Sequence, residues 1–243
     1  MSPASDPIVR LNPGLDPRRI APVFKSHGRA HIPQIFPAEV AERIHRALVE
    51  ETPWGRVFGG AGRHHDFGPG GWEAVPADQR REVELAVQRA GQAGFAYFYE
   101  NFPVADCHAA GRYLDSYLMR VYEFLNSAEF LEFARVVTGA PQIRLADAQA
   151  TCYRPGDFLT QHDDHVPDKR RRAAYVFNFT RVWRADWGGQ LQFLDADGHV
   201  AEAYTPAFNA LNLLAVPQPH AVSYVAPLAV GARYSMTGWL RET

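Results

Sequence analysis

The second part of the chain contains a series of short segments whose composition is typical of β-strands. Eight of them, rich in Val, Tyr, Phe, Leu and Thr, follow Pro141 and are separated by Pro, Gly and Asp. So many short strands within about a hundred residues predict a closed or two-sheet antiparallel fold such as a jelly roll. The predicted strands are Ile143–Tyr153, Phe158–His162, Ala173–Phe179, Gln190–Leu194, Val200–Ala203, Ala210–Val216, Ala221–Val225 and Arg233–Leu240.

The first part of the chain has the pattern of helices. Pro37 suits the first turn of a helix, and apolar residues follow it at helical spacing. Further helices are predicted over residues 77–101 and 115–138, the second restarting at Ser127. Helices followed by strands indicate the α+β class.

The boundary near Pro141 is interpreted as a change of layer within one structural domain. Residues 1–140 would form a helical support and substrate-loop region, because a helical half alone would leave its apolar faces uncovered. The glycine-rich segments 59–62 and 68–71 predict a flexible loop within that region. Residues 141–243 would form the β core.

Composition excludes several classes of protein. With 47% hydrophobic residues and a net charge of −2, the chain is typical of a compact globular protein and gives no reason to expect nucleic-acid binding. Cys107 and Cys152 are too few for a disulfide framework and are expected to be buried free thiols. Neither a secretory signal nor an apolar run of about 18 residues is visible, so we expect a cytoplasmic protein without a membrane partner.

His162-Asp163-Asp164 carries the strongest chemical signal. In a strand, residues two apart face the same side, so His162 and Asp164 would both point into a barrel while Asp163 points out. His220, 58 residues downstream, is the best candidate for a third ligand from a neighbouring strand. Two histidines and one carboxylate around open coordination positions are typical of non-haem Fe(II) oxygenases.

Two alternatives compete with this assignment. His64-His65-Asp66 also contains a His-x-Asp pattern, but it lies in the predicted glycine-rich loop, which lacks a rigid element to hold ligands. His162 and His165 have helical spacing, although Pro155-Gly156 and Pro167 argue against a helix there.

Arg233 provides a second, independent signal. It follows His220 by 13 residues and shares one strand face with Ser235. A guanidinium beside a hydroxyl inside an apolar barrel is a carboxylate-binding arrangement, because a buried unpaired Arg is very costly. The alternative is a surface Arg on an edge strand. An iron with open positions and an inward Arg together suit a small dianion such as 2-oxoglutarate.

With these residues, the sequence resembles the Fe(II)- and 2-oxoglutarate-dependent oxygenases of the prolyl 4-hydroxylase type. The resemblance covers about Ala148 to Arg241, and it implies a double-stranded β-helix with supporting N-terminal helices. It rests on an ordered set of motifs, namely Tyr153…Gly156-Asp157-Phe158-Leu159, His162-x-Asp164, Tyr175-Val176-Phe177-Asn178, Trp187-Gly188-Gly189-Gln190-Leu191-Gln192-Phe193, His220-Ala221-Val222 and Arg233-Tyr234-Ser235-Met236-Thr237-Gly238-Trp239.

The resemblance assigns roles and cofactors. His162, Asp164 and His220 would be the catalytic iron ligands, and Arg233 would pair with the distal carboxylate of 2-oxoglutarate. Tyr153 would donate its hydroxyl to the same co-substrate, with Ser235 as a weaker candidate. Fe(II), 2-oxoglutarate and O2 are implied, with ascorbate as a further cofactor. Relatives that halogenate lack the carboxylate ligand, so Asp164 favours hydroxylation of a C–H bond.

The substrate is less constrained than the chemistry. The leading interpretation is a dioxygenase that hydroxylates a prolyl-type residue in a protein, and the alternative is a hydroxylase of a free amino acid or other small metabolite. A metal-binding barrel without turnover is a third possibility. The basic run Lys169–Arg172 is typical of a solvated loop, or of a rim that steers an acidic substrate. The oligomeric state is not indicated.

Overall fold

The computed structural model describes residues 6–60 and 62–243. The α-helices are α1 Pro17–His27, α2 Ala38–Arg46, α3 Ala77–Ala93, α4 Val104–Ala109, α5 Tyr117–Leu125 and α6 Ala128–Thr138. The strands are β1 Arg29–Pro33, β2 Gly55–Gly60, β3 Arg63–Phe67, β4 Ala96–Phe102, β5 Leu145–Ala146, β6 Gln149–Tyr153, β7 Phe158–His162, β8 Arg171–Asn178, β9 Leu191–Leu194, β10 Val200–Tyr204, β11 Ala210–Ala215, β12 His220–Val222 and β13 Arg233–Arg241. Short irregular helices cover Ala47–Glu51, Pro167–Lys169 and Ala185–Trp187.

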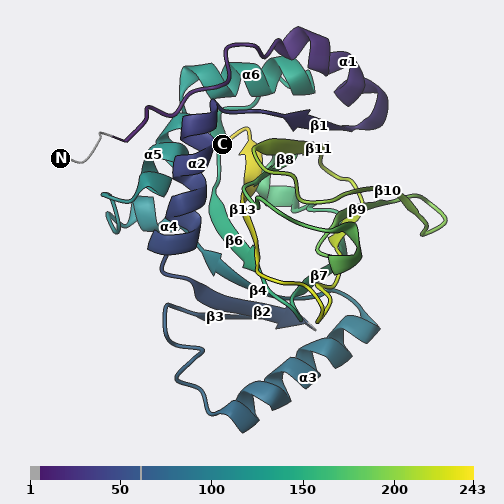
Figure 1. The fold of residues 1–243 in the computed structure, drawn as a ribbon. Coiled ribbons are helices and arrows are strands. Elements are labelled where there is room, and N and C mark those ends of the chain that lie inside the picture. The colour runs from purple at the N-terminus through teal and green to yellow at the C-terminus, as the bar shows by residue number, and fades with distance from the viewer. Residues whose placement is uncertain (1–5, 61) are drawn as a thin grey trace.

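The strands form one antiparallel sheet that rolls into a nearly closed barrel (Figure 1). Its order is β1-β11-β8-β13-β6-β4-β7-β12-β9-β10, with β2 and β3 attached to β4 and with β5 attached to β13. The two ends of this order approach each other, because Arg29 of β1 forms an ion pair with Glu202 of β10. The rings of His31 and Tyr204 also lie 5.3 Å apart across the same gap. This architecture confirms the predicted jelly roll with supporting helices.

Most of the described helices pack against one outer face of the barrel (Figure 1). Helices α1, α2, α4, α5 and α6 contribute to the largest apolar cluster together with β6, β8, β11 and β13. Phe177 of β8 is fully buried there, with its ring centroid 5.3 Å from that of Phe36 and 5.8 Å from that of Phe130. The helices therefore brace the strands that carry part of the site.

Successive side chains of a strand point to opposite faces of the sheet, so each of these strands has one face toward the helices and one toward the interior of the barrel. Along β13, Met236 and Leu240 pack in the apolar cluster under the helices, whereas Arg233, Ser235 and Trp239 line the interior of the barrel. The same strand thus supplies apolar contacts outside and polar groups inside. The predicted shared face of Arg233 and Ser235 is confirmed.

The predicted helix over residues 77–101 is wrong after Ala93, in its last third. Helix α3 ends at Ala93, and Gly94 caps it with an N–H to the carbonyl of Ala90. The chain then enters β4, which pairs with β2, β6 and β7 in the middle of the sheet. The consecutive aromatic residues Tyr97, Phe98 and Tyr99 favour a strand, because Tyr97 and Tyr99 line the cavity while Phe98 packs with Val87 of α3 on the other face.

The structure around the glycine-rich segments also differs from the predicted loop. Instead of a flexible loop, β2 and β3 form an antiparallel hairpin, and His64-His65-Asp66 lies on its edge strand. Strands β1 to β4 therefore precede Pro141 within the described ranges of the chain, so the division into helices first and strands afterwards was too simple. Helices α1 and α4 were not predicted, and the single strand expected over Ile143–Tyr153 is two strands, β5 and β6.

The helical break predicted at Ser127 is confirmed. The hydroxyl of Ser127 caps α6 by accepting a hydrogen bond from the N–H of Phe130, and Ser116 caps α5 in the same way. Gly139 ends α6 with a φ of +66°, a left-handed conformation that glycine adopts without strain. Local capping signals thus fix the ends of both helices.

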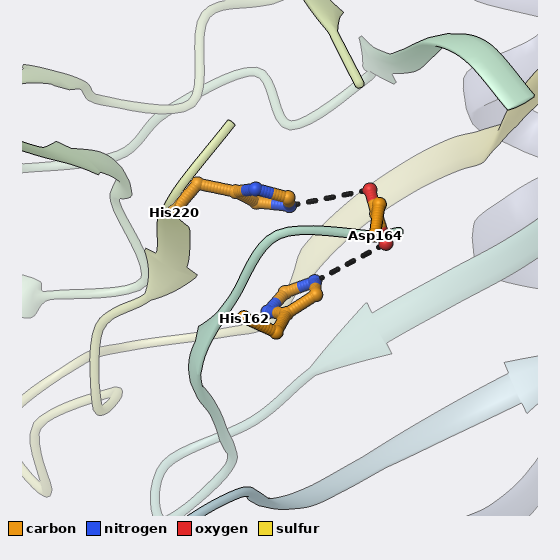
Figure 2. Close-up of side chains that lie close together, drawn as sticks. All are labelled: His162, Asp164 and His220. Carbon is orange, nitrogen blue, oxygen red and sulfur yellow. Dashed lines mark ion pairs between the residues drawn. The ribbon is translucent and has the colours of Figure 1, made fainter. Parts of the chain in front are cut away.

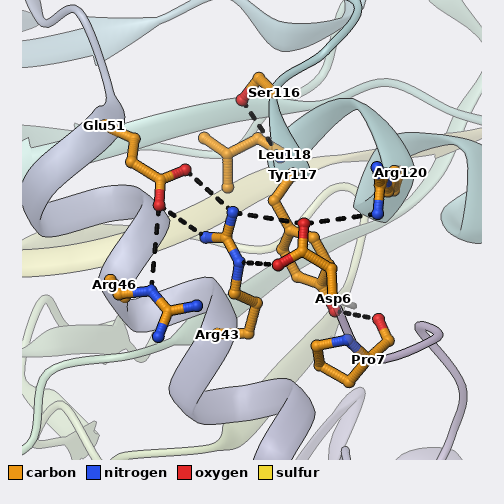
Figure 3. A network of polar contacts seen from close by, with 9 residues as sticks. All are labelled: Asp6, Pro7, Arg43, Arg46, Glu51, Ser116, Tyr117, Leu118 and Arg120. Carbon is orange, nitrogen blue, oxygen red and sulfur yellow. Dashed lines mark hydrogen bonds and ion pairs between the residues drawn. The ribbon is translucent and has the colours of Figure 1, made fainter. Parts of the chain in front are cut away.

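A polar network fastens the start of the described chain to the helical layer (Figure 3). The guanidinium of Arg43 in α2 donates to Asp6 and to Glu51 and lies 4.5 Å from the ring centroid of Tyr117. The Tyr117 hydroxyl in turn donates to the carbonyl of Pro7 at 2.7 Å. These contacts join residues 6–7 to α2 and α5.

Two further expectations concern the cysteines and membrane-spanning helices. Cys107 and Cys152 are both buried free thiols, as predicted. In the part of the chain that the structure describes, none of the helices has the length and apolar character needed to cross a membrane.

The packing of Phe177 leads to a stability prediction. Phe177→Ala should lower the free energy of unfolding by about 3–5 kcal/mol, because it leaves a cavity between the sheet and α6. Val182→Ala, at a side chain that is 73% exposed, should change it by less than about 0.5 kcal/mol. Urea denaturation followed by circular dichroism would measure both. Equal effects would contradict the assigned core.

Candidate active site

Strand pairing brings the two candidate histidines together. In the antiparallel pair of β7 and β12, His162 and His220 are direct cross-strand partners. Their ring centroids lie 4.1 Å apart. The 58-residue separation in sequence is thus closed by one pair of strands, as the sequence analysis expected.

Asp164 reaches the site by a different route from the one predicted. Strand β7 ends at His162, and Asp164 has a φ of +63°, outside the strand conformation. This left-handed turn directs its carboxylate back between the two histidines (Figure 2). Asp163 is exposed and its carboxylate accepts a hydrogen bond from the N–H of His165, so it is not part of the cluster. The predicted pairing of residues is right, but its explanation by strand periodicity is wrong.

The three side chains form a compact cluster with suitable donor atoms. Nε2 of His162 lies 3.4 Å from Oδ1 of Asp164, and Nε2 of His220 lies 3.4 Å from Oδ2 (Figure 2). Each Nδ1 faces a carbonyl oxygen, that of Thr160 at 3.0 Å and that of Gln218 at 2.7 Å, so Nδ1 carries the hydrogen and Nε2 is free to bind a metal. Among the described residues, this is the one group of three His, Cys, Asp or Glu side chains close enough to hold an ion.

The electrostatics of the cluster favour the ligand forms of Asp164 and His220. Burial raises the pKa of Asp164, but the neighbouring His162 and His220, when protonated, outweigh it and hold the pKa below its ordinary value. Burial also lowers the pKa of His220, helped by the neighbouring His162. An ionised carboxylate beside neutral imidazoles is the protonation state that a divalent metal requires.

Arg233 lies in the same cavity without a protein partner. The cavity has a volume of about 420 Å³ and is lined by the three clustered residues and by Arg233. The Arg233 side chain is 2% exposed, and none of the described residues forms a hydrogen bond or an ion pair with it. Burial lowers its pKa, and its Nε is left without a partner. A guanidinium in this state calls for an anionic ligand, because a buried uncompensated charge is strongly unfavourable.

Tyr153 and Ser235 lie beside Arg233, as the sequence analysis proposed for co-substrate contacts. Tyr153 is the cross-strand partner of Arg233, whose Cζ lies 5.1 Å from the tyrosine ring centroid. Burial raises the pKa of Tyr153 well above its ordinary value, so its hydroxyl remains a hydrogen-bond donor. The Ser235 hydroxyl is shared with that of Thr151 at 2.8 Å, which makes it the less available of the two.

Two consecutive glycines allow the backbone to pass close to this pocket. A Cβ on Gly188 would lie 2.0 Å from the carbonyl oxygen of Tyr224, and a Cβ on Gly189 would lie 3.2 Å from Trp183 and 3.6 Å from the side chain of Arg233. Both glycines have a positive φ. Glycine is therefore favoured at both positions of the Trp187-Gly188-Gly189 motif, because a larger side chain would crowd Tyr224 or the residues packed around Arg233.

Several residues that line the cavity were not predicted from the sequence. Tyr97 and Tyr99 of β4 line the wall, and the ring of Tyr99 stacks on that of Tyr153 at 4.9 Å. They were missed because this segment was predicted to be helical. Their spacing of two residues was the signal that indicates a common strand face.

The rival histidine segment and the basic run take other positions. Nδ1 of His64 contacts the hydroxyl of Tyr97 at 2.5 Å, and the ring of His65 stacks on Phe58. These residues do not join the cluster. Within the basic run, Arg171 lines the cavity, which corrects the interpretation of the whole run as a solvated loop.

The comparisons with known proteins agree with this geometry. A family model, that of the 2OG-Fe(II) oxygenase superfamily, matches residues 148–241. Among curated proteins, none matches the chain.

Solved structures share the fold. An oxidoreductase of the 2OG-Fe(II) oxygenase family from Burkholderia pseudomallei has 16% identity and a TM-score of 0.59, covering 96% of this chain and 94% of that one. A prolyl hydroxylase from Trichoplax adhaerens, in complex with a hypoxia inducible factor peptide fragment, has 16% identity and a TM-score of 0.55, covering 93% and 90%. The non-heme alpha ketoglutarate dependent epimerase SnoN from nogalamycin biosynthesis has 10% identity and a TM-score of 0.53, covering 93% and 82%.

These structural similarities show a common fold. The part of the chain that carries the cluster and Arg233, residues 148–241, matches the family model of the 2OG-Fe(II) oxygenase superfamily.

Proposed function

We propose that the protein is an Fe(II)- and 2-oxoglutarate-dependent dioxygenase that hydroxylates a C–H bond. We further propose that its substrate is a prolyl-type residue of a protein. The observation that carries this proposal is the presence of two complementary groups in one cavity. These are the His162, Asp164 and His220 cluster and the buried, unpaired guanidinium of Arg233.

The donor set fits Fe(II). Two neutral imidazole nitrogens and one carboxylate are the protein ligands of non-haem iron oxygenases, which leave coordination positions open for other ligands. The carbonyls of Thr160 and Gln218 orient the two rings through their Nδ1 hydrogens. Arg233 fits the far carboxylate of 2-oxoglutarate, since a planar guanidinium binds a carboxylate through two parallel hydrogen bonds.

The side chains of the cavity bind and orient the co-substrate and shield the reacting groups from water. When bound, Fe(II) and 2-oxoglutarate supply the activation of dioxygen coupled to decarboxylation to succinate. Arg233 neutralises one end of the co-substrate, and Tyr153 is placed to donate its hydroxyl beside it. Leu159, Leu191 and Val222 line the same cavity and exclude water from the reacting groups.

A peptide substrate suits the mouth of the cavity. Phe95 and Val166 line it and are 49% and 39% exposed, so they offer apolar contacts to a chain that lies across the opening. The prolyl hydroxylase from Trichoplax adhaerens, which shares the fold, is solved with a peptide fragment. The alternative is a free amino acid or small metabolite. It is supported by the negatively charged Asp163 and the positively charged Arg171, which both line the cavity and match the two charges of an amino acid.

Two accessory features belong to the proposal. Ascorbate is proposed as a reductant that keeps the iron in the ferrous state, and a cytoplasmic location is proposed from the sequence. Succinate formation with and without ascorbate would test the first, and cell fractionation would test the second.

The first prediction concerns the cluster. His162→Ala, Asp164→Ala and His220→Ala should each abolish turnover and weaken Fe(II) binding while the fold survives, because each removes one of three ligands. Anaerobic calorimetry would measure Fe(II) affinity, and circular dichroism would check the fold. Asp163→Ala is the matched control and should retain iron. An equal loss in Asp163→Ala, or removal of iron by His64→Ala, would show that the ligands are misassigned.

The second prediction concerns Arg233. Arg233→Ala should weaken 2-oxoglutarate binding by about 2–5 kcal/mol, or roughly 30- to several-thousand-fold, because the charge-assisted pair is lost. Fe(II) affinity should change far less, and Arg233→Lys should be intermediate because an ammonium lacks the planar fork. Titration of 2-oxoglutarate into Fe(II)-loaded protein would measure these values. An unchanged midpoint in Arg233→Ala would place the carboxylate on another basic residue.

The third prediction separates the classes of substrate. Purified protein with Fe(II) and 2-oxoglutarate should form succinate in air, and prolyl peptides should stimulate this more than free proline or other amino acids. Mass spectrometry of the peptide should show the gain of one oxygen atom. Stimulation by free amino acids alone would favour the alternative. Absence of succinate under all conditions, with iron bound, would favour a metal-binding barrel without turnover.

A further inference from the structure

The basic run after β7 divides into outward and inward residues. Arg170 and Arg172 approach Glu242, and their side chains are 63% and 48% exposed. The Arg171 side chain is 14% exposed and lines the cavity. One residue of the run therefore faces the site, and its two neighbours are matched controls in sequence and charge.

Arg171 contacts Asp164 and Trp239. Its Nη1 donates to the main-chain carbonyl of Asp164 at 3.0 Å and lies 4.0 Å from the carboxylate oxygen Oδ1. Its guanidinium carbon lies 3.6 Å from the ring centroid of Trp239, a residue of β13. The guanidinium is thus held on a rigid strand while it holds the backbone of Asp164.

Asp164 needs such support. Its φ of +63° is an unfavourable conformation for a residue with a Cβ, and it lies beyond the end of β7, outside the strand pairing. The neighbouring Asp163 is fixed through its own carbonyl and carboxylate, which accept from the N–H groups of Gln218 and His165. The carbonyl of Asp164 accepts from Arg171.

We propose that Arg171 is a positioning residue that fixes the left-handed turn at Asp164 and so aims its carboxylate at the metal position. This inference rests on the metal site of the proposed function. Arg171 acts through Asp164 without touching the metal position itself, and stacking on Trp239 limits the directions in which its donors point.

The experiment measures metal binding, and not only turnover. Anaerobic titration of Co(II) into the full chain, followed by its visible absorption, reports both affinity and coordination. Arg171→Ala should weaken Co(II) binding by about 10- to 100-fold and alter the spectrum, as losses of residues that orient metal ligands do. Arg170→Ala and Arg172→Ala should bind like the wild type. Arg171→Lys should be intermediate, because it keeps the charge and loses the planar stack.

A double-mutant cycle distinguishes positioning from general destabilisation. In an Asp164→Ala background, Arg171→Ala should cause no further loss of Co(II) affinity, because the group it positions is already absent. An equal loss in both backgrounds would overturn the inference. If Arg171→Ala fails to fold, the same cycle with Arg171→Lys decides.

The outcomes for the two proposals are distinct. Wild-type protein that does not bind Co(II) or Fe(II) would remove the proposed metal site and this inference with it. Wild-type protein that binds metal, with Arg171→Ala binding equally well, would leave the proposed function intact and overturn the role of Arg171 alone.

Discussion

The antiparallel pairing of β7 with β12 is the interaction on which the site depends. It places His162 opposite His220 and brings two residues separated by most of the β core to a ring-centroid distance of 4.1 Å. Cross-strand partners on one face of a sheet are held by the backbone ladder, so the spacing of the two rings is set by strand geometry. The same ladder leaves Asp164 unpaired at the strand end, and the third donor therefore depends on local contacts.

The position of Arg233 depends on apolar packing elsewhere in the fold, which offsets the cost of its buried charge. It pairs in register with Tyr153, its guanidinium lies over the tyrosine ring, and it has no anionic partner among the described residues. Such a group weakens the folded state, since a desolvated charge without a counter-ion is unfavourable. The fold tolerates it because the opposite face of β13 and of its neighbour β8 buries Met236, Phe177 and other apolar residues against the helices. Apolar packing outside the barrel thus supports an unsatisfied charge inside it.

The sequence was informative wherever strand periodicity and turn chemistry act locally. The jelly roll, the shared face of Arg233 and Ser235, and the helix break at Ser127 could all be predicted, because alternation and capping depend on residues a few positions apart. The Pro155-Gly156 turn between β6 and β7 is of the same kind, with Gly156 at a φ of +99°.

Other features depend on contacts that a linear pattern does not show. Strand β4 was taken for a continuation of the helix although Tyr97, Phe98 and Tyr99 favour a strand, because its partners β6 and β7 lie about fifty to sixty residues away in the sequence. The turn at Asp164 was missed for a similar reason, since its support comes from Arg171. That residue looked like part of a solvated basic run until the structure placed it on Trp239.

The contrast between the three donors indicates how such a site can be adjusted. Both histidines are fixed by strands and by carbonyls within two residues of each ring, at Thr160 and Gln218, so their positions vary little with distant changes. The carboxylate depends on Arg171, and Arg171 depends on Trp239 of the strand that also carries Arg233. Strand β13 therefore contributes to both ends of the cavity, at the carboxylate through Trp239 and at the co-substrate pocket through Arg233. A displacement of this one strand would disturb the carboxylate and the co-substrate pocket together and leave the paired histidines in place.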